Sequence, residues 1–460
     1  MRKFRTTKVI RFVGRSSNMQ SLLGNGGYAF FSLMLFLFLV RKVDQVMYGQ
    51  WVIFMTVASL ADLFRTGLAG TGAIRKISIS RGAERELQAA SSYYLSIFTT
   101  AGISFLFLIA GLVIRGFADD SFYASVFLMY PILGISNLPL IQSLQYSQGL
   151  LDFRRVMVIR IVSGFLNLVI PGLYVLFSTV TFEGLVLVYA SASFAGSVVV
   201  SIAGWDGRKT LKHFDMQSVK SLYSFGKYGM LSTISSSFLR SSDTIIISLA
   251  PIMGAGAVAI YAIPFKLVEL VEIPLRSFTS TVYPKLSRAI KEDLEQFNQI
   301  LYEYITYTIL LLFPVLVMMG LFPEILLGFL GGKAYAGSLD IQAQILYILV
   351  IYIFLLPLDR YMGMALFALD KPKVNFKKIS LMLLSNIIFD LIAVFIFKSL
   401  AGVAMASVFF TLVGILVGIK YISRESGFRI SKLFSRFEVT VNYLIFIVKN
   451  MVYVRKSQAN

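Results

Sequence analysis

The chain has 460 residues, of which 57% are hydrophobic and only 15% charged, and its formal net charge is +19. Soluble globular chains carry roughly 25% charged residues, so this composition excludes a soluble protein and indicates a chain that lies mostly in lipid. The absence of cysteine excludes disulfides, thiolate nucleophiles and zinc–thiolate sites.

Long apolar runs recur from Leu22 almost to the end of the chain. A bilayer core about 30 Å thick needs about 20 mainly apolar residues in a helix. The runs predict an all-α integral membrane protein with about twelve transmembrane helices. The predicted spans are 18–40, 49–69, 91–114, 123–148, 156–178, 184–203, 225–250, 257–282, 301–321, 341–366, 378–397 and 403–423.

Basic residues are distributed unevenly between the two sides of these spans. Most of the 43 lysine and arginine residues fall in the terminal segments and in the loops on the same side as them. The other side holds a handful: Arg41, Lys42, Arg115, Lys333 and Lys398. Because cytosolic loops are rich in Lys and Arg, both termini are predicted to be cytosolic, and the net charge needs no nucleic acid. The outer loops are too short for a catalytic domain, so no enzyme activity is predicted.

A polar, basic segment at 204–224 divides the spans into two sets of six. The predicted domains are an N-terminal lobe at 1–203, a cytosolic linker at 204–224, a C-terminal lobe at 225–423 and a cytosolic basic tail at 424–460. Within the tail, 439–454 is predicted to lie on the membrane surface. Because six is even, the two lobes have parallel orientations, and a central cavity is expected between them, as in an alternating-access transporter.

An internal repeat supports this division. Pro139 in the fourth span precedes Asp152 by thirteen residues, and Pro357 in the tenth span precedes Asp370 by the same interval. An asparagine then occurs in the fifth span, Asn167, and in the eleventh, Asn386. Counted from the two prolines, these asparagines differ in position by one residue.

Charges inside the seventh and eighth spans are the first functional candidates, because a charge at the centre of a spanning helix costs roughly 2.5–3.5 kcal/mol. In the seventh span, Arg240 and Asp243 share one helix face and either form a local ion pair or face a polar cavity. The eighth span carries a stripe of four charges within a 120° arc, which lines a cavity or joins a buried network. The stripe consists of Lys266, Glu269, Glu272 and Arg276.

Three further charges lie in later spans. Asp359 and Arg360 are in the cytosolic third of the tenth span, where both snorkelling and substrate contact are open. Asp390 lies near the middle of the eleventh span with no charged residue within four positions. It is either a proton-relay carboxyl or a hydrogen-bonded structural acid. Near the cytosolic end of the second span, Arg65 is predicted to snorkel or to pair with Asp62.

The seventh and eighth spans also carry a resemblance to a known family. The stretch runs from Arg240-Ser-Ser-Asp243-Thr-Ile-Ile-Ile through Gly256 and Ala259-Ile260-Tyr261 to Val282-Tyr283-Pro284-Lys285-Leu286-Ser287. This order resembles the Wzx-type polysaccharide and oligosaccharide flippases of the multidrug/oligosaccharidyl-lipid/polysaccharide exporter superfamily.

The resemblance implies a function. Such flippases move an undecaprenyl-diphosphate-linked oligosaccharide from the cytosolic to the outer leaflet of a bacterial cell membrane, coupled to an H⁺ or Na⁺ gradient. They use no cofactor, and the chain has no Walker-type phosphate loop. A glycan polymerase and other assembly proteins are expected partners.

Candidate roles follow from charge. Guanidinium and ammonium groups bind diphosphate strongly, which makes Arg240, Lys266, Arg276 and Arg360 the substrate-binding candidates. The acids Asp243, Glu269, Glu272, Asp359 and Asp390 pair with these charges or couple to ions. Acids and bases are equally numerous inside the spans, so a cation or drug antiporter is an alternative. A membrane scaffold, glycosyltransferase or glycan polymerase is the alternative from another class.

Overall fold

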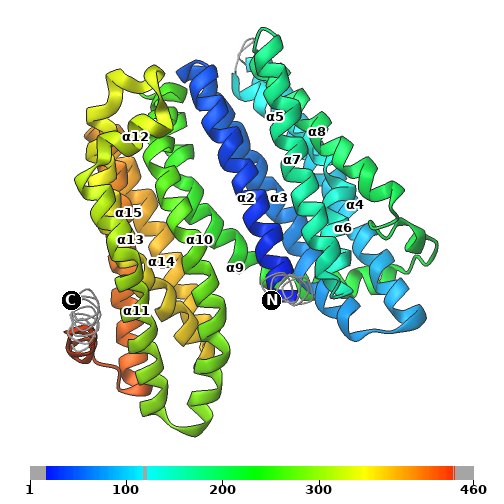
Figure 1. The fold of residues 1–460 in the computed structure, drawn as a ribbon. Helices are drawn as coiled ribbons and strands as arrows, with labels where there is room; N and C mark the ends of the chain where they lie inside the picture. Colours follow the sequence, from blue (N-terminus) through cyan, green and yellow to red (C-terminus); the bar gives the residue numbers. More distant parts are fainter. Residues whose placement is uncertain (1–16, 118–121, 439, 441–460) are drawn as a thin grey trace, which may run out of the picture. The chain divides into compact units, whose positions relative to one another are not determined.

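The computed structural model describes residues 17–117, 122–438 and 440, and within these residues the chain forms helices and no strand (Figure 1). The α-helices are α2 (Ser17–Lys42), α3 (Gln45–Ile79), α4 (Gly82–Phe117), α5 (Phe122–Ser136), α6 (Leu138–Gly149), α7 (Phe153–Phe177), α8 (Phe182–Ile202), α9 (Met216–Leu249), α10 (Gly254–Glu292), α11 (Leu294–Leu321), α12 (Pro323–Gly331), α13 (Leu339–Ala368), α14 (Pro372–Leu391) and α15 (Leu400–Ser426). Two 3₁₀ turns, η1 (Arg208–Lys212) and η2 (Lys333–Ser338), and one π-helical turn, η3 (Ile392–Ile396), complete them. Residues 430–438 form a further short helix, named here the tail helix.

The membrane-spanning character of these helices follows from their composition. In the described part of the chain, nine helices are long and apolar enough to cross a bilayer, and the bent pair α5–α6 makes a tenth crossing if it is one span. A helix lies at each of the twelve predicted spans. Helices α9 and α10 fall outside the apolar set, and these two contain the charges of the seventh and eighth spans. The predicted all-α membrane fold is confirmed, whereas the predicted surface segment at 439–454 lies outside the described residues.

The fourth predicted span is broken. Helix α5 ends at Ser136, α6 begins at Leu138, and their axes differ by 48°. Pro139 lies in the first turn of α6, where its missing N–H costs nothing. A break inside lipid leaves backbone carbonyls without helical partners, and these must be satisfied locally. The Arg65 guanidinium donates to the carbonyl of Gly134, and the Ser197 hydroxyl donates to the carbonyl of Ser136 at 2.6 Å.

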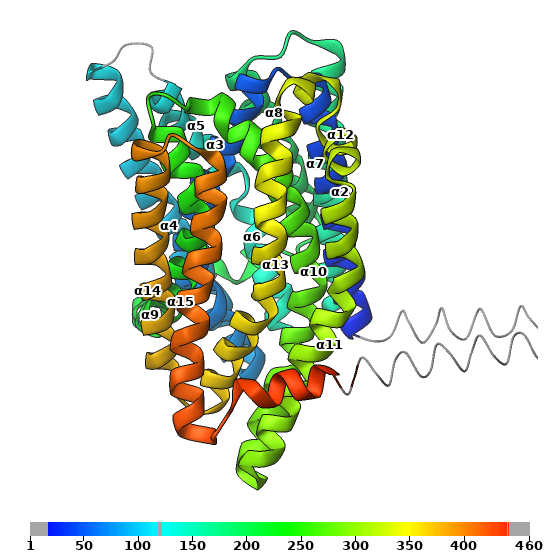
Figure 2. The same cartoon turned by 90° about the vertical axis from the view of Figure 1, so that its left-hand side faces the viewer.

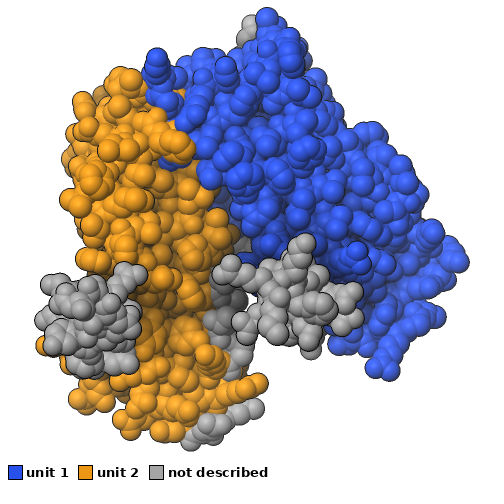
Figure 3. All heavy atoms as spheres, viewed as in Figure 1, with its two compact units in different colours: residues 1–248, 254–259, 330–334 blue, residues 249–253, 260–329, 335–460 orange. Residues whose placement is uncertain are grey.

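The chain separates into two compact units (Figure 3). Unit 1 comprises the described residues of 1–248, 254–259 and 330–334. Within it α2 lies along α7, α3 packs on α4 and α6, and α8 packs on α5 and α7 (Figure 1). Helix α9 up to Ser248 belongs to this unit by its contacts, although the sequence places residues from 225 onward in the second lobe. The six-and-six division stays a prediction.

Unit 2 comprises the described residues of 249–253, 260–329 and 335–460. Its helix α15 packs on α13 and α14, and α11 packs on α13 (Figure 2). The main apolar cluster of this unit joins α10, α11, α13, α15 and the tail helix. Its fully buried members include Leu286, Phe297 and Met362.

The predicted linker at 204–224 packs against unit 1. The Tyr94 hydroxyl of α4 donates to the carbonyl of Leu211 at 3.1 Å, and its ring contacts Phe214 with centroids 4.6 Å apart. Helix α9 begins at Met216, so the end of the predicted linker is helical.

The turns after α6 and α13 support the internal repeat and correct its register. Leu151 and Asp370 both have positive φ angles, 58° and 56°. The N–H of Leu151 donates to the carbonyl of Gln148 at 3.0 Å, and the N–H of Asp370 donates to the carbonyl of Phe367 at 3.1 Å. Leu151 and Asp370 are therefore equivalent positions. Leu151 and Asp370 are 219 residues apart in the sequence, and Asn167 and Asn386 are separated by the same number.

Asp152 and Asp370 are consequently not equivalent, contrary to the sequence match. Asp152 is the N-cap of α7, and its carboxylate accepts the N–H of Arg155 at 3.1 Å. Asp370 occupies the left-handed turn position instead, and Lys371 precedes α14.

Candidate functional site

Glu272 is the centre of a charge cluster in unit 2. Its side chain on α10 is 3% exposed and accepts hydrogen bonds from two arginines. Arg276, one turn further along α10, donates from Nη2 to Oε2 at 2.9 Å. Arg360 of α13 donates from Nη2 to Oε1 at 3.2 Å. The i, i+4 spacing places the first arginine, and the packing of α13 against α10 supplies the second. We name these three residues the Glu272 cluster.

The Glu272 cluster carries a net positive charge, because one carboxylate faces two guanidinium groups. The arginine side chains are the accessible part: Arg276 is 62% exposed and Arg360 is 37% exposed. A guanidinium has five N–H donors, and each hydrogen bond to Glu272 uses one of them. The remaining donors suit an anion with several oxygen atoms, such as a phosphate.

Lys266 and Glu269 form a separate pair on α10. Nζ of Lys266 lies 2.7 Å from Oε2 of Glu269, and the side chains are 21% and 44% exposed. The stripe predicted from the sequence therefore divides into a neutral pair and the net positive Glu272 cluster. Lys266 is the weaker candidate for anion binding, since its charge is balanced locally.

Asp359 is held in a second ion pair, next to Arg360 in the sequence. The Lys378 ammonium of α14 donates to the Asp359 carboxylate and, at 3.1 Å, to its backbone carbonyl. Asp359 is 6% exposed and Lys378 is 2% exposed, so Asp359 does not snorkel to the interface. Two buried, mutually paired charges form a structural contact between α13 and α14.

Lys378, the first residue of the predicted span 378–397, is the site residue that the sequence analysis missed. Two signals could have found it. Asp359 lies nine residues before the end of α13 and Lys378 six residues after the start of α14, so the two lie at similar depths in consecutive antiparallel helices. Lys378 also shares a helix face, at intervals of four residues, with Met382, Asn386 and Asp390.

Asp390 lies at the other end of that face of α14. Asp390 and Asn386 are both fully buried, one turn apart. Helix α15, which packs against α14, contributes the buried hydroxyls Ser407 and Thr411. The π-helical turn at Ile392–Ile396 begins two residues after Asp390, and such turns occur often at functional sites. Both α14 and α15 thus carry buried side-chain oxygens, which are suitable ligands for a proton or a small cation.

Arg240 and Asp243 lie in unit 1, on the part of α9 assigned to that unit. Asp243 is buried, with 3% exposure, and Arg240 is half-buried. Their predicted pairing with each other stays a prediction. Of the nine predicted site residues, the other seven lie in unit 2.

Unit 1 has an ion cluster of its own around Arg65. Nη2 of Arg65 lies 2.9 Å from Oδ1 of Asp62, and the Tyr130 hydroxyl donates to the same oxygen at 3.1 Å. Arg65 is 1% exposed, so the predicted snorkelling is wrong and the predicted pairing with Asp62 is confirmed. The guanidinium also caps the carbonyl of Gly134 at the α5–α6 break. We name Asp62, Arg65 and Tyr130 the Arg65 cluster.

Comparisons with known proteins agree with this architecture. A family model described as a polysaccharide biosynthesis protein matches residues 38–340. The chain is 24% identical over 346 residues to the "Putative O-antigen transporter" of Shigella flexneri, an alignment that covers 74% of this chain and 81% of that protein.

Two solved structures show the fold. One is the inward-facing conformation of a multidrug resistance MATE family transporter of the MOP superfamily, with a TM-score of 0.71, 16% identity and coverage of 88% of this chain and 98% of the other. The second is the lipid II flippase MurJ in its inward closed conformation, with a TM-score of 0.71, 16% identity and coverage of 93% of both chains. These similarities confirm the exporter-superfamily fold.

Proposed function

Because the chain belongs to the polysaccharide biosynthesis protein family, we propose that it is a flippase for an undecaprenyl-diphosphate-linked oligosaccharide in a bacterial inner membrane. The similarity to an O-antigen transporter supports a glycan as cargo. The fold that the chain shares with a lipid II flippase suits a lipid-linked substrate. Both termini are cytosolic in this proposal, and a glycan polymerase acts on the product.

The observation that carries the proposal is the arrangement of the Glu272 cluster. A diphosphate presents several anionic oxygens, and two guanidiniums held by one buried carboxylate form a preorganised anion-binding site. Arg276 and Arg360 bind the diphosphate, and Glu272 positions them. Arg240 and Lys266 each have an acid three residues further along the sequence and are the weaker candidates for binding the headgroup.

Transport proceeds by alternating access and is driven by an ion gradient. The buried face of α14 is the coupling element, with Asp390 as the group that takes up H⁺ or Na⁺. Asp359 acts structurally through its pair with Lys378. Asp243 and Glu269 balance the charges of Arg240 and Lys266.

The cluster is tested by replacing its arginines in a strain whose own flippase gene is deleted. Arg276→Ala and Arg360→Ala should each lower surface glycan by about tenfold or more, the effect of losing one charge-assisted hydrogen bond. The measurements are glycan staining on gels and immunoblotting of the membrane fraction. Arg288→Ala, an exposed arginine further along α10, is the matched control. Normal glycan with both variants at wild-type protein levels would contradict the proposal.

The same deletion strain separates the flippase from the cation or drug antiporter. A flippase deletion removes surface glycan and leaves resistance to cationic dyes unchanged. An antiporter deletion gives the reverse pattern, dye sensitivity with normal glycan.

Ion coupling is tested on Asp390 in proteoliposomes. Asp390→Asn keeps the size of the side chain and removes its ionisable group. Transport of a fluorescent lipid-linked oligosaccharide should lose its dependence on a pH or Na⁺ gradient in this variant. Dependence equal to that of the wild type would assign coupling to another residue.

A further inference from the structure

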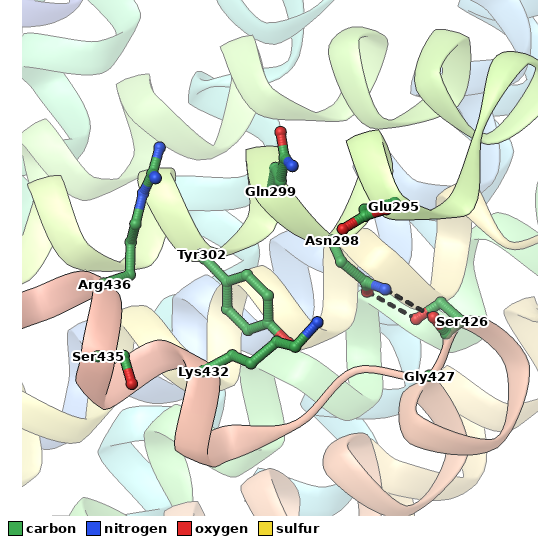
Figure 4. A pocket seen from close by; sticks show the side chains of 9 residues that line it. All are labelled: Glu295, Asn298, Gln299, Tyr302, Ser426, Gly427, Lys432, Ser435 and Arg436. Atoms are coloured by element: carbon green, nitrogen blue, oxygen red, sulfur yellow. Dashed lines mark hydrogen bonds between the residues drawn. The ribbon is translucent and has the colours of Figure 1, made fainter.

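A polar pocket of about 520 Å³ lies in unit 2, and none of its lining residues belongs to the Glu272 cluster (Figure 4). Its walls are the first turns of α11, the end of α15 and the tail helix. All lining residues except a glycine have polar or charged side chains. They are Glu295, Asn298, Gln299, Tyr302, Ser426, Gly427, Lys432, Ser435 and Arg436.

Hydrogen bonds join α11 to the end of α15 and to the residue directly before the tail helix. Asn298 donates to the carbonyl of Ser426 at 2.6 Å and accepts from the Ser426 hydroxyl at 2.8 Å. The Tyr302 hydroxyl donates to the carbonyl of Arg429 at 3.1 Å and accepts its N–H at 2.9 Å. Gly427, with φ of 70°, provides the left-handed turn from α15 into the tail helix. The pocket is therefore preformed.

The tail helix has the amphipathic pattern of a helix on a membrane surface. It runs across the ends of α11 and α15 (Figure 2). Leu433 and Phe437 pack into the apolar cluster of unit 2, while Ile430 and Phe434 are 41% and 70% exposed. At 100° per residue these four share one face, and the basic residues occupy the other. Such a helix inserts its apolar face at the level of the lipid headgroups.

Charges of both signs line the pocket. Arg436 forms an ion pair with Glu303 of α11, which holds it in place. Among the described residues, the Lys432 ammonium has no hydrogen bond or ion pair, and it lies between Glu295 and Arg436 (Figure 4). The Glu295 carboxylate lies at the opposite end of the pocket from Arg436. The pocket thus offers a cation for a phosphate and, beside it, an anion for an amine.

We propose that this pocket binds the phosphoethanolamine headgroup of a membrane phospholipid. The phosphate contacts Lys432 and the Ser435 hydroxyl, and the ammonium group donates to Glu295. An anionic glycerol headgroup has no ammonium for Glu295, and a choline headgroup has no N–H to donate. This site is additional to the proposed flippase function and does not depend on it.

The test is lipid binding to the purified full-length protein by native mass spectrometry. The probes are dioleoyl phosphatidylethanolamine, the corresponding phosphatidylglycerol and phosphatidylcholine, and inorganic phosphate. The wild-type protein should bind one phosphatidylethanolamine most tightly. Lys432→Ala should weaken this binding by about tenfold, because one charge-assisted contact is lost. Lys373→Ala, an exposed lysine outside the pocket, is the matched control and should bind as wild type.

Glu295→Gln tests the recognition of the amine. The variant should lose its preference for phosphatidylethanolamine over phosphatidylglycerol while still binding both. Three results would overturn the proposal: Lys432→Ala binding phosphatidylethanolamine as tightly as wild type, a preference that survives Glu295→Gln, and displacement of the lipid by millimolar inorganic phosphate. The last would assign the pocket to free phosphate.

Discussion

The Arg65 cluster of unit 1 and the Glu272 cluster of unit 2 contain the same kinds of ion with opposite burial. In the first, the arginine is 1% exposed and the Asp62 side chain is 26% exposed. In the second, the carboxylate is 3% exposed, and the two arginines are 62% and 37% exposed. The N–H groups of a buried arginine face other protein groups. When the carboxylate is buried instead, the arginines paired with it lie nearer the surface and keep N–H groups that a ligand can reach.

The physical roles follow from that difference. Arg65 satisfies a carbonyl freed by the α5–α6 break, so its guanidinium replaces a helical hydrogen bond and belongs to the architecture. Glu272 fixes the positions of two guanidiniums whose other donors remain available to a ligand. Burial of each partner, more than the presence of an ion pair, separates a structural cluster from a candidate binding site.

The largest effect is expected from Arg65→Met. This change leaves Asp62 without its cationic partner and removes the Arg65 donor from the carbonyl of Gly134, which should destabilise the protein by about 3–5 kcal/mol. Thermal unfolding of the purified protein, followed by tryptophan fluorescence, reports on unit 1 because both tryptophans, Trp51 and Trp205, lie in it. Arg154→Met, an exposed arginine of α7, is the control and should unfold as wild type. If Arg65→Met were as stable as the control, Arg65 would not stabilise the α5–α6 break.

Lys378→Met should come next, with a loss of about 3 kcal/mol, because it leaves Asp359 buried and unpaired. The double variant Lys378→Met with Asp359→Leu should recover most of that loss, since both buried charges are gone. Thermal unfolding followed by circular dichroism measures both. A double variant less stable than Lys378→Met would show that Asp359 has another essential contact.

Arg276→Ala should change stability by less than about 1 kcal/mol, because Arg276 is largely exposed and the buried Glu272 keeps Arg360 as its partner. The expected combination is normal unfolding with lost glycan export, the opposite of what a structural arginine would give. Unfolding and surface glycan are measured on the same preparations. A loss of stability as large as that of Arg65→Met would make the two clusters equivalent and end the contrast drawn between them.

The smallest effect is expected from Asp215→Ala, at a half-buried residue directly before α9 and outside the membrane. Asp215 accepts the N–H of Ser218 at 2.8 Å, and its hydrogen bonds to Ser218 hold the pKa of its carboxyl below the usual value. A lowered folded-state pKa gives stability that is present above about pH 4 and is lost as the pH falls through the folded-state pKa. The slight deficit of the variant at pH 7 should vanish near pH 3 in thermal unfolding. A deficit independent of pH would mean that the carboxylate is not the stabilising group.

The sequence by itself determined the properties that depend on local composition. Apolar runs long enough for a bilayer predicted where helices lie, and charges spaced along one helix predicted that Glu272 and Arg276 share a face. The i, i+3 spacing of Asp62 and Arg65 likewise predicted their pair. Each of these depends on residues within one or two turns, where helical geometry is fixed by the backbone.

Only the tertiary structure decided which distant side chains meet. Arg360 reaches Glu272, Lys378 reaches Asp359, and Arg65 reaches the carbonyl of Gly134 through contacts between different helices. The tertiary structure also shows that the helix is interrupted just before Pro139, whereas α13 continues through Pro357. The physical reason is that a charge or a freed carbonyl in lipid must find a partner, and helix packing determines which partner is within reach.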